Sequence, residues 1–276
     1  MKYFILILFF FTQMAQAQNK RFIYQYTCIP DSTNTTDIIK DIMFLDVINN
    51  KSLFYSRFKF TEDSTSIAEA QKKNFYIPNA PILYRVEKTN GKIFLLTTDY
   101  GLGKISVEEN RIINWKIDPA KQKIGEYNSQ KATADFGGRK WIAWFTTDIP
   151  IQDGPYKFSG LPGLIVKMED VTKSHIYELI GVKNLSKEIE YPDLNSGAKE
   201  LTLTRKQFEE AFVKYRKDPA AATRQRYIEG KIIDHRDSVG NLRTGADVVR
   251  DVEKSSKERL KKDNNIIEID LLKTIR

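Results

Sequence analysis

Residues 149–165 read Ile-Pro-Ile-Gln-Asp-Gly-Pro-Tyr-Lys-Phe-Ser-Gly-Leu-Pro-Gly-Leu-Ile, a stretch dense in turn-forming residues. Pro162-Gly163 suits the centre of a type II turn, because proline fixes φ at the first central position and glycine tolerates positive φ at the second. Gly154-Pro155 marks an earlier turn. The stretch therefore predicts a corner in the chain built from tight turns.

The same stretch predicts how this corner is held. Gly160 allows a close approach of the backbone. Leu161, Leu164 and Ile165 would fix the loop on the core where the next strand begins. A structural role is preferred to a ligand site for the residues of this corner, which are Pro150, Gly154, Pro155, Gly160, Leu161, Pro162, Gly163, Leu164 and Ile165.

Segments that alternate apolar and polar residues lie on both sides of the corner, as strands do. Phe54, Phe58 and Phe60 fall on one face at period two, and Asn90-Gly91 is a strong hairpin signal. Strands are predicted over residues 22–28, 41–47, 52–61, 82–87, 92–98, 103–108, 111–117, 123–135, 139–146, 164–170 and 175–185. Turns are expected at residues 109–110 and 137–138.

Helical signals appear near residue 200. Residues 204–207 form a capping box, Phe208, Ala211, Phe212 and Tyr215 follow as one apolar stripe, and Pro219 ends the helix. A second, highly charged helix is expected over residues 247–262, and residues 267–271 alternate like a short strand. The fold is thus predicted to be mainly β (α+β): a curved antiparallel sheet or half-barrel of about ten strands, with one or two helices packed toward the C-terminus.

The first residues predict export. Met1-Lys2 gives a positive start, residues 3–11 are apolar but too short to span a bilayer, and Ala15-Gln16-Ala17 is a cleavage site. We expect a signal peptide over 1–17 and one domain over 18–276, more polar from about 245, in the periplasm or outside the cell. An uncleaved anchor is the less favoured alternative. Cys28 is the only cysteine, which disfavours a lipoprotein.

Composition excludes several classes of protein. The net charge is +8, but cations and acids are interspersed, so nucleic-acid binding is not expected. A mild attraction to anionic membrane surfaces is compatible with the charge. No later segment predicts a transmembrane helix. His175 and His235 do not stand at metal-ligand spacing, and no nucleophile elbow, phosphate loop or dinucleotide motif occurs, so we predict no catalytic residues, metal or cofactor.

Residues 160–165, Gly-Leu-Pro-Gly-Leu-Ile, resemble the motif that names the GLPGLI family, exported proteins of Bacteroidota whose function is largely uncharacterised. The rest of the chain is similar to the family's pattern at Lys131-Ala132, Arg139, Trp141, Trp144, Asp148-Ile149-Pro150, Gly154-Pro155, Asn264-Asn265 and Ile267-Glu268. The family usually has a proline where Ile266 stands. The resemblance implies an exported domain over the whole mature chain.

Three functions stay open. Trp141 and Trp144 should point to opposite faces of one strand. We hypothesise that Trp144, Phe158, Leu161 and Leu164 line an apolar groove for a lipid-like or peptide ligand, in a binding protein that is not an enzyme. The alternatives are a structural or interaction protein of the cell envelope, meeting a partner through a sheet edge or the basic C-terminal region, and a hydrolase without a recognisable motif.

Overall fold

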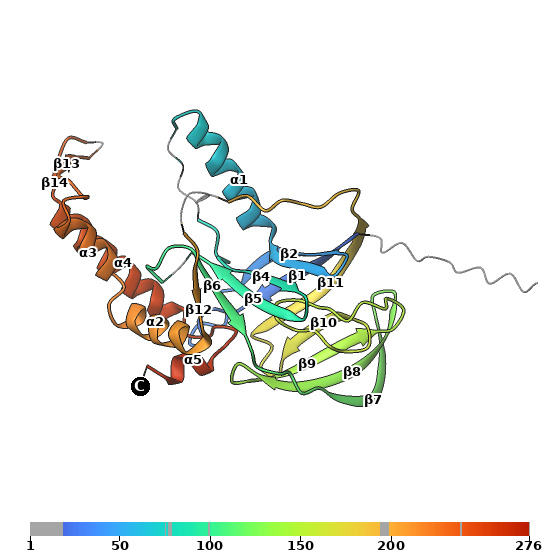
Figure 1. The fold of residues 1–276 in the computed structure, drawn as a ribbon. Coiled ribbons are helices and arrows are strands. Elements are labelled where there is room, and N and C mark those ends of the chain that lie inside the picture. Colours follow the sequence, from blue (N-terminus) through green and yellow to red (C-terminus); the bar gives the residue numbers. More distant parts are fainter. Residues whose placement is uncertain are drawn as a thin grey trace, which may run out of the picture.

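The computed structural model describes residues 19–74, 76, 79–98, 100–193, 199–237 and 239–275 (Figure 1). The signal peptide expected over 1–17 lies outside the described residues. The elements are β1 (Lys20–Cys28), β2 (Ile39–Ile48), β3 (Lys51–Ser56), α1 (Arg57–Gln71), β4 (Arg85–Thr89), β5 (Lys92–Thr97), β6 (Ile105–Glu109), β7 (Lys116–Ile124), β8 (Tyr127–Phe136), β9 (Arg139–Thr146), β10 (Leu164–Asp170), β11 (His175–Asn184), β12 (Leu201–Leu203), α2 (Arg205–Lys217), α3 (Ala221–Ile228), β13 (His235–Arg236), β14 (Leu242–Arg243), α4 (Gly245–Lys262) and α5 (Asp270–Lys273).

One open sheet of twelve strands dominates the fold, in the order β12-β6-β5-β4-β3-β2-β1-β11-β10-β9-β8-β7. From β1 the chain winds outward strand by strand to β6. It then crosses to the opposite edge at β7 and winds back to β11, which pairs with β1. All neighbours are antiparallel except β12, which runs parallel to β6. The mainly β fold predicted from the sequence is confirmed, with twelve strands in place of about ten.

The crossing from β6 to β7 requires the sheet to curl. In a flat sheet the ten spacings between β6 and β7 would separate them by roughly 48 Å. The link has only residues 110–115, and an extended chain from 109 to 116 spans at most about 25 Å. The two arms must therefore bend toward each other, and they enclose a concave face between them.

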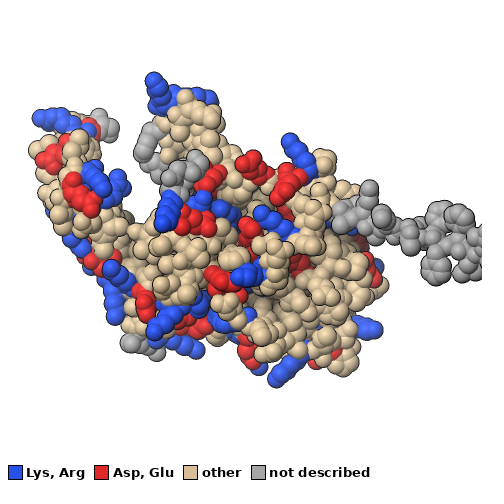
Figure 2. Space-filling view, viewed as in Figure 1, with Lys and Arg blue, Asp and Glu red and all other residues tan. Residues whose placement is uncertain are grey.

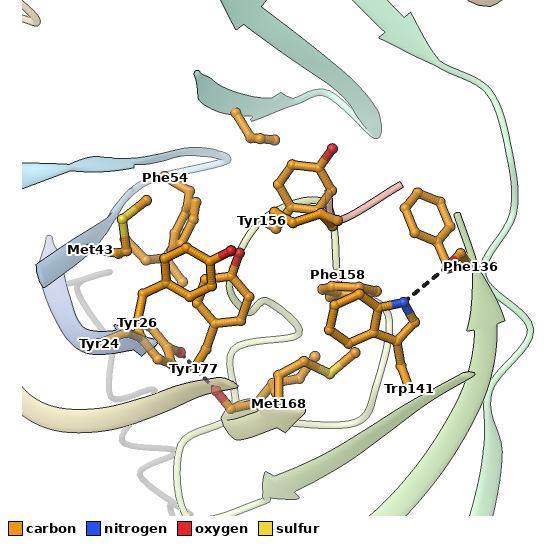
Figure 3. Close-up of a cluster of buried hydrophobic side chains, with 14 of the residues drawn as sticks. Tyr24, Tyr26, Met43, Phe54, Phe136, Trp141, Tyr156, Phe158, Met168 and Tyr177 are labelled. Carbon is orange, nitrogen blue, oxygen red and sulfur yellow. Dashed lines mark hydrogen bonds between the residues drawn. The ribbon is translucent and has the colours of Figure 1, made fainter. Parts of the chain in front are cut away.

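Aromatic side chains fill this concave face. Alternate residues of β1 are buried, so Tyr24 and Tyr26 point into the core, where the Tyr26 ring stacks on Tyr177 with ring centroids 4.2 Å apart. Trp141 projects from β9 into the same core and is fully buried (Figure 3). Trp144 is only partly buried. The two tryptophans thus lie on opposite faces of β9, as the spacing predicts.

The loop between β9 and β10, residues 147–163, folds into the concave face, and we call it the plug loop. Phe158 is fully buried and lies against Trp141, with ring centroids 4.8 Å apart (Figure 3). The Leu164 amide donates to Ile149 O at 3.1 Å, and the Ile165 amide to Asp153 O at 3.0 Å, closing the loop on itself. The plug loop therefore contributes side chains to the core that fills the concave face.

The turn chemistry of the plug loop differs from the prediction. The Gly163 amide donates to Leu161 O at 2.8 Å, so Pro162 is the centre of a three-residue turn, not of a type II turn. The close approach is at Gly163, where an added Cβ would lie 2.0 Å from Thr146 O. At Gly160 an added Cβ meets nothing within 4 Å, and glycine is favoured there by its φ of +90° instead.

The strand predicted over 52–61 is wrong after residue 56. Ser56 caps α1: its hydroxyl accepts from the Lys59 amide at 2.9 Å, and the chain turns into a helix at Arg57. Phe58 and Phe60 therefore lie on a helix, and Phe58 is exposed. The alternating aromatic residues indicated a strand, but the helix cap at Ser56 determines the conformation of the residues that follow it.

Three further strand predictions, over 111–117, 123–135 and 267–271, are wrong at least in part. Residues 110–115 are the link between the two sheet edges, so the hairpin expected at residues 109–110 does not form. The strand expected over 123–135 is divided by a turn at Gly125, whose φ is +56°, and β8 begins at Tyr127. The predicted strand at 267–271 does not form, because residues 267–269 bend and the short helix α5 begins at Asp270.

Residues 263–275, the C-terminal segment, are held by polar contacts to the sheet. The Asn264 and Asn265 amides donate to Pro30 O. The buried Arg139 guanidinium donates to the backbone oxygens of residues 265, 266 and 267 and, at 3.1 Å, to the Asp170 carboxylate. Residues far apart in the sequence, at 139 and at 264–268, therefore meet at one place.

We predict that Gly163→Ala destabilises the protein far more than Gly160→Ala. The first puts a methyl group into the Thr146 carbonyl, which only a backbone shift can relieve, and should lower the free energy of unfolding by about 3 kcal/mol or more. The second only strains φ and should cost about 1 kcal/mol. Urea unfolding of both variants measures the difference, and equal losses would contradict the close approach.

Candidate functional site

A cleft of about 440 Å³ lies beside the plug loop. It is bounded by the β2–β3 turn at Asn49 and Asn50, by the β4–β5 turn at Gly91 and by plug-loop residues 151–153 and 159. Two strand turns and one wall of the plug loop thus frame an opening at the end of the concave face.

Lys88 of β4 ties the plug loop to the sheet at this cleft. Its buried ammonium donates to Asp153 Oδ1 at 2.5 Å, to Gly154 O at 2.8 Å and to Phe158 O at 3.0 Å. Burial lowers the pKa of Lys88, and the Asp153 charge opposes this shift. Three acceptors match the three ammonium protons, so Lys88 acts as a charged clamp.

Ser52 of β3 stands directly opposite Lys88 in the sheet register and also lines the cleft. The residue is only 4% exposed, yet its Oγ has no hydrogen-bond partner among the described residues. A buried hydroxyl without a partner is destabilising by about 1–3 kcal/mol and is rare in native proteins. The cleft therefore lies beside one buried hydroxyl whose hydrogen-bonding capacity is unmet among the described residues.

Aliphatic side chains complete the lining. Val47, Ile93 and Ile151 border the cleft, and each is a partly buried residue that packs against the core. The lining is thus mixed: apolar patches from three segments surround the Ser52 hydroxyl and the Lys88–Asp153 ion pair. Such a surface suits a small molecule that has both apolar groups and hydrogen-bonding groups.

The residues predicted to bind a ligand lie elsewhere. Phe158, Leu161 and Leu164 are at most 1% exposed and pack in the core, and Trp144 is partly buried on the opposite face of the sheet. None of the four lines this cleft or a second, smaller cavity near α1. Their role in ligand binding stays a prediction. The structure shows that they pack within the plug loop and the sheet.

Sequence reasoning missed Ser52 and Lys88. Both are polar residues at inward-facing positions of strands, in register with apolar neighbours such as Phe54 and Val86. That break in the alternation was a readable signal. Asp153 lies within residues 149–165, but no local sequence pattern indicates that its carboxylate pairs with Lys88, a strand residue 65 positions away.

A buried ion cluster lies on the other side of the plug loop. Lys157 donates to Glu109 at 2.8 Å and to Glu268 at 2.5 Å, and Arg111 bonds both carboxylates. Burial alone would raise the pKa of these carboxyls, but the neighbouring cations prevail: the pKa of Glu109 falls to about 2, and that of Glu268 is held well below its ordinary value.

The two histidines take no part in the cleft. His175 is buried: Nε2 lies 2.7 Å from Asn265 O and Nδ1 lies 2.7 Å from the Tyr26 hydroxyl. A carbonyl accepts only from a protonated nitrogen, so the ring is the neutral tautomer with its proton on Nε2. Burial, and next the charge of Arg139, lowers the pKa of His175 to about 4. His235 is exposed on the β13–β14 hairpin.

Among the described residues no group of His, Cys, Asp or Glu could hold a metal ion. The described helices also include none that is long and apolar enough to cross a membrane.

The comparisons with known proteins match one short segment of the sequence and, separately, the fold. A family model described as a protein of unknown function (Porph_ging) matches residues 137–167, which span β9, the plug loop and the start of β10. None of the curated proteins matches the sequence. Two structures of PNGF-II, in space groups P21 and C2, are similar with a TM-score of 0.50 and identities of 17% and 18%.

Each PNGF-II comparison covers 72% of this chain but only 34% of the PNGF-II chain. This chain therefore spans about a third of the length of those structures. At such low identity the similarity concerns the fold alone, and it assigns neither activity nor ligand to this chain.

We predict an acid-induced loss of stability that comes from His175. The unfolded chain binds a proton near pH 6.5 and the folded chain only near 4, so stability is complete above about pH 6.5 and declines as pH falls between these values. The linkage amounts to about 2 kcal/mol between pH 7 and pH 5. Urea unfolding of His175→Gln should lack this loss, because an amide can keep both hydrogen bonds without titrating.

His235→Gln is the matched control for that experiment, since residue 235 is exposed. Its unfolding free energy should follow the wild-type pH profile. A His175→Gln profile that also coincides with wild type would show that the buried imidazole is not the origin of the pH dependence.

Proposed function

We propose that the chain is an exported binding protein of the cell envelope that holds a peptide-like ligand in the cleft beside the plug loop. The observation that carries this proposal is the Ser52 hydroxyl, buried in the lining of the cleft without a partner. A bound ligand that hydrogen-bonds Ser52 removes the penalty of that unmet group, so ligand binding and stability are linked at this residue.

The chemistry of the lining supports a peptide over a lipid tail. A cleft of about 440 Å³ lies within the usual size of small-molecule sites, roughly 300–1,000 Å³. An acyl chain would bury the Ser52 hydroxyl against methylene groups and leave it unpaired. A short peptide offers backbone carbonyls and amides for Ser52 and the nearby asparagines, and side chains for the three aliphatic residues.

The contacts of the polar residues argue against catalysis at this cleft. A Ser–Lys pair needs a neutral lysine with a free lone pair to act as base. Lys88 instead donates to three acceptors, which hold it charged. Both ring nitrogens of His175 are engaged in the core. A binding function is therefore favoured over a hydrolase.

A partner that adds a strand to the sheet is also disfavoured at β7. This edge strand contains Pro119, Lys116, Lys121 and Lys123, and its register with β8 is interrupted between residues 117 and 121. Proline, lysine and bulges on an edge strand are features that prevent edge-to-edge pairing. An interaction role through that edge is thus less favoured than ligand binding in the cleft.

Export and family complete the proposal. The apolar segment and the cleavage site within residues 1–17 support secretion to the periplasm or beyond. The family-model match covers residues 160–165, which supports a relationship to GLPGLI proteins. In such a protein the hexapeptide would serve the cleft indirectly, since the plug loop forms one of its walls.

We predict that Ser52→Ala weakens ligand binding while leaving the free protein at least as stable. NMR titration of the mature protein with uncharged tripeptides, and separately with laurate, is the test. Peptides should shift the amide signals of residues 49–52 and 88–93, and laurate should not. Ser52→Ala should weaken peptide binding about fivefold, the worth of one hydrogen bond.

Ser56→Ala is the matched control on the same strand. Ser56 caps α1 and donates to Asp41 at 2.5 Å, so its loss should lower the free energy of unfolding by about 1 kcal/mol without weakening peptide binding. Peptides that shift no signals around the cleft would overturn the proposed function. So would a Ser52→Ala variant that binds as wild type.

A further inference from the structure

Residues 221–262 form an arm that extends from the body of the protein (Figure 1). It consists of α3, the β13–β14 hairpin and α4, and its two helices pack on each other. By contrast, α2 packs on β6, β12 and α5. The hydrophobic core of the described residues contains none from the arm. The arm therefore presents most of its surface to the surroundings.

The outer end of the arm is apolar. Ile228, Ile233, Val239 and Leu242 are between 60% and 78% exposed, and they lie at the end of α3 and around the hairpin, far from the sheet (Figure 1). Single exposed aliphatics are normal on protein surfaces, but several gathered at a projecting tip indicate a contact site.

The arm also carries an excess of positive charge. Residues 221–262 contain eleven Lys and Arg against seven Asp and Glu, a net +4, which is half of the +8 of the whole chain. Figure 2 shows basic and acidic side chains interleaved along the arm. Near the tip, Asp234 accepts from the Gly245 amide and Asp237 from the Val239 and Asn241 amides, so both acids are occupied by backbone donors.

We propose that this arm docks on an anionic lipid surface, with the aliphatic tip entering the interface and the basic helices facing the headgroups. Burial of exposed aliphatics and attraction of cations to anionic lipids are the two terms that hold peripheral segments on membranes. The arm supplies both on one projecting element. This inference uses the exported location proposed above but does not depend on the cleft.

Co-sedimentation of the mature protein with lipid vesicles tests the proposal. Vesicles of equal parts phosphatidylcholine and phosphatidylglycerol should bind the protein at least about tenfold more tightly than pure phosphatidylcholine vesicles, and added salt should weaken the binding. The double variant Ile233→Ser and Val239→Ser should bind the mixed vesicles about tenfold more weakly, because two apolar side chains no longer enter the interface.

Ile112→Ser is the matched control, since Ile112 is 83% exposed but lies on the link between β6 and β7. It should bind as wild type. Equal binding to both vesicle types would overturn the proposal, and so would an Ile233/Val239 variant that binds as wild type. Sedimentation velocity adds a further outcome: a dimer that the double variant abolishes, without vesicle binding, would assign the tip to a second copy of the chain instead.

Discussion

The buried carboxylate of Glu268 is the contact on which the rest of the structure depends. It accepts hydrogen bonds from Lys157 and Tyr156 of the plug loop, from Arg111 of the link between the sheet edges and from Arg205 at the start of α2. The plug loop, the β6–β7 link and α2 thus all contact one side chain of the C-terminal segment, so four segments that are far apart in the sequence meet there. A charge buried in this way is tolerated only because every partner is in place.

The ion cluster around Glu268 joins segments at the opening between the two arms of the sheet. The short link between β6 and β7 brings the two arms of the sheet together but does not pair them. The plug loop and the C-terminal segment fill the gap, and three cations balance three carboxylates there: Lys157, Arg111 and Arg205 against Glu109, Glu268 and Asp270. Lys88 holds the same loop at Asp153, Gly154 and Phe158, on either side of Tyr156 and Lys157, and the cleft lies beside this clamp. The wall of the candidate site is therefore held from both sides.

Local patterns in the sequence predicted the local elements well. The strands at 139–146 and 164–170 have the observed bounds, and the capping box at Thr204 starts α2 as expected. The structure depends elsewhere on contacts that no local pattern contains. The β6–β7 link resembled a hairpin because its turn residues are ordinary, and only the global sheet order shows that it spans two edges. Ser52, Lys88 and Glu268 owe their importance to partners 36 to 157 residues away in the sequence, which periodicity cannot reveal.

A double-mutant cycle of Lys157→Met and Glu268→Gln tests the central role of the buried cluster most directly. The exposed pair Lys257–Glu253 serves as control and should contribute less than about 0.5 kcal/mol. We expect each single variant to lose about 3 kcal/mol or more of unfolding free energy, and the double variant to lose less than the sum of the two, by at least about 1 kcal/mol. Losses that simply add, within about 0.5 kcal/mol, would contradict this expectation, because the loop and the C-terminal segment would then be held independently of each other.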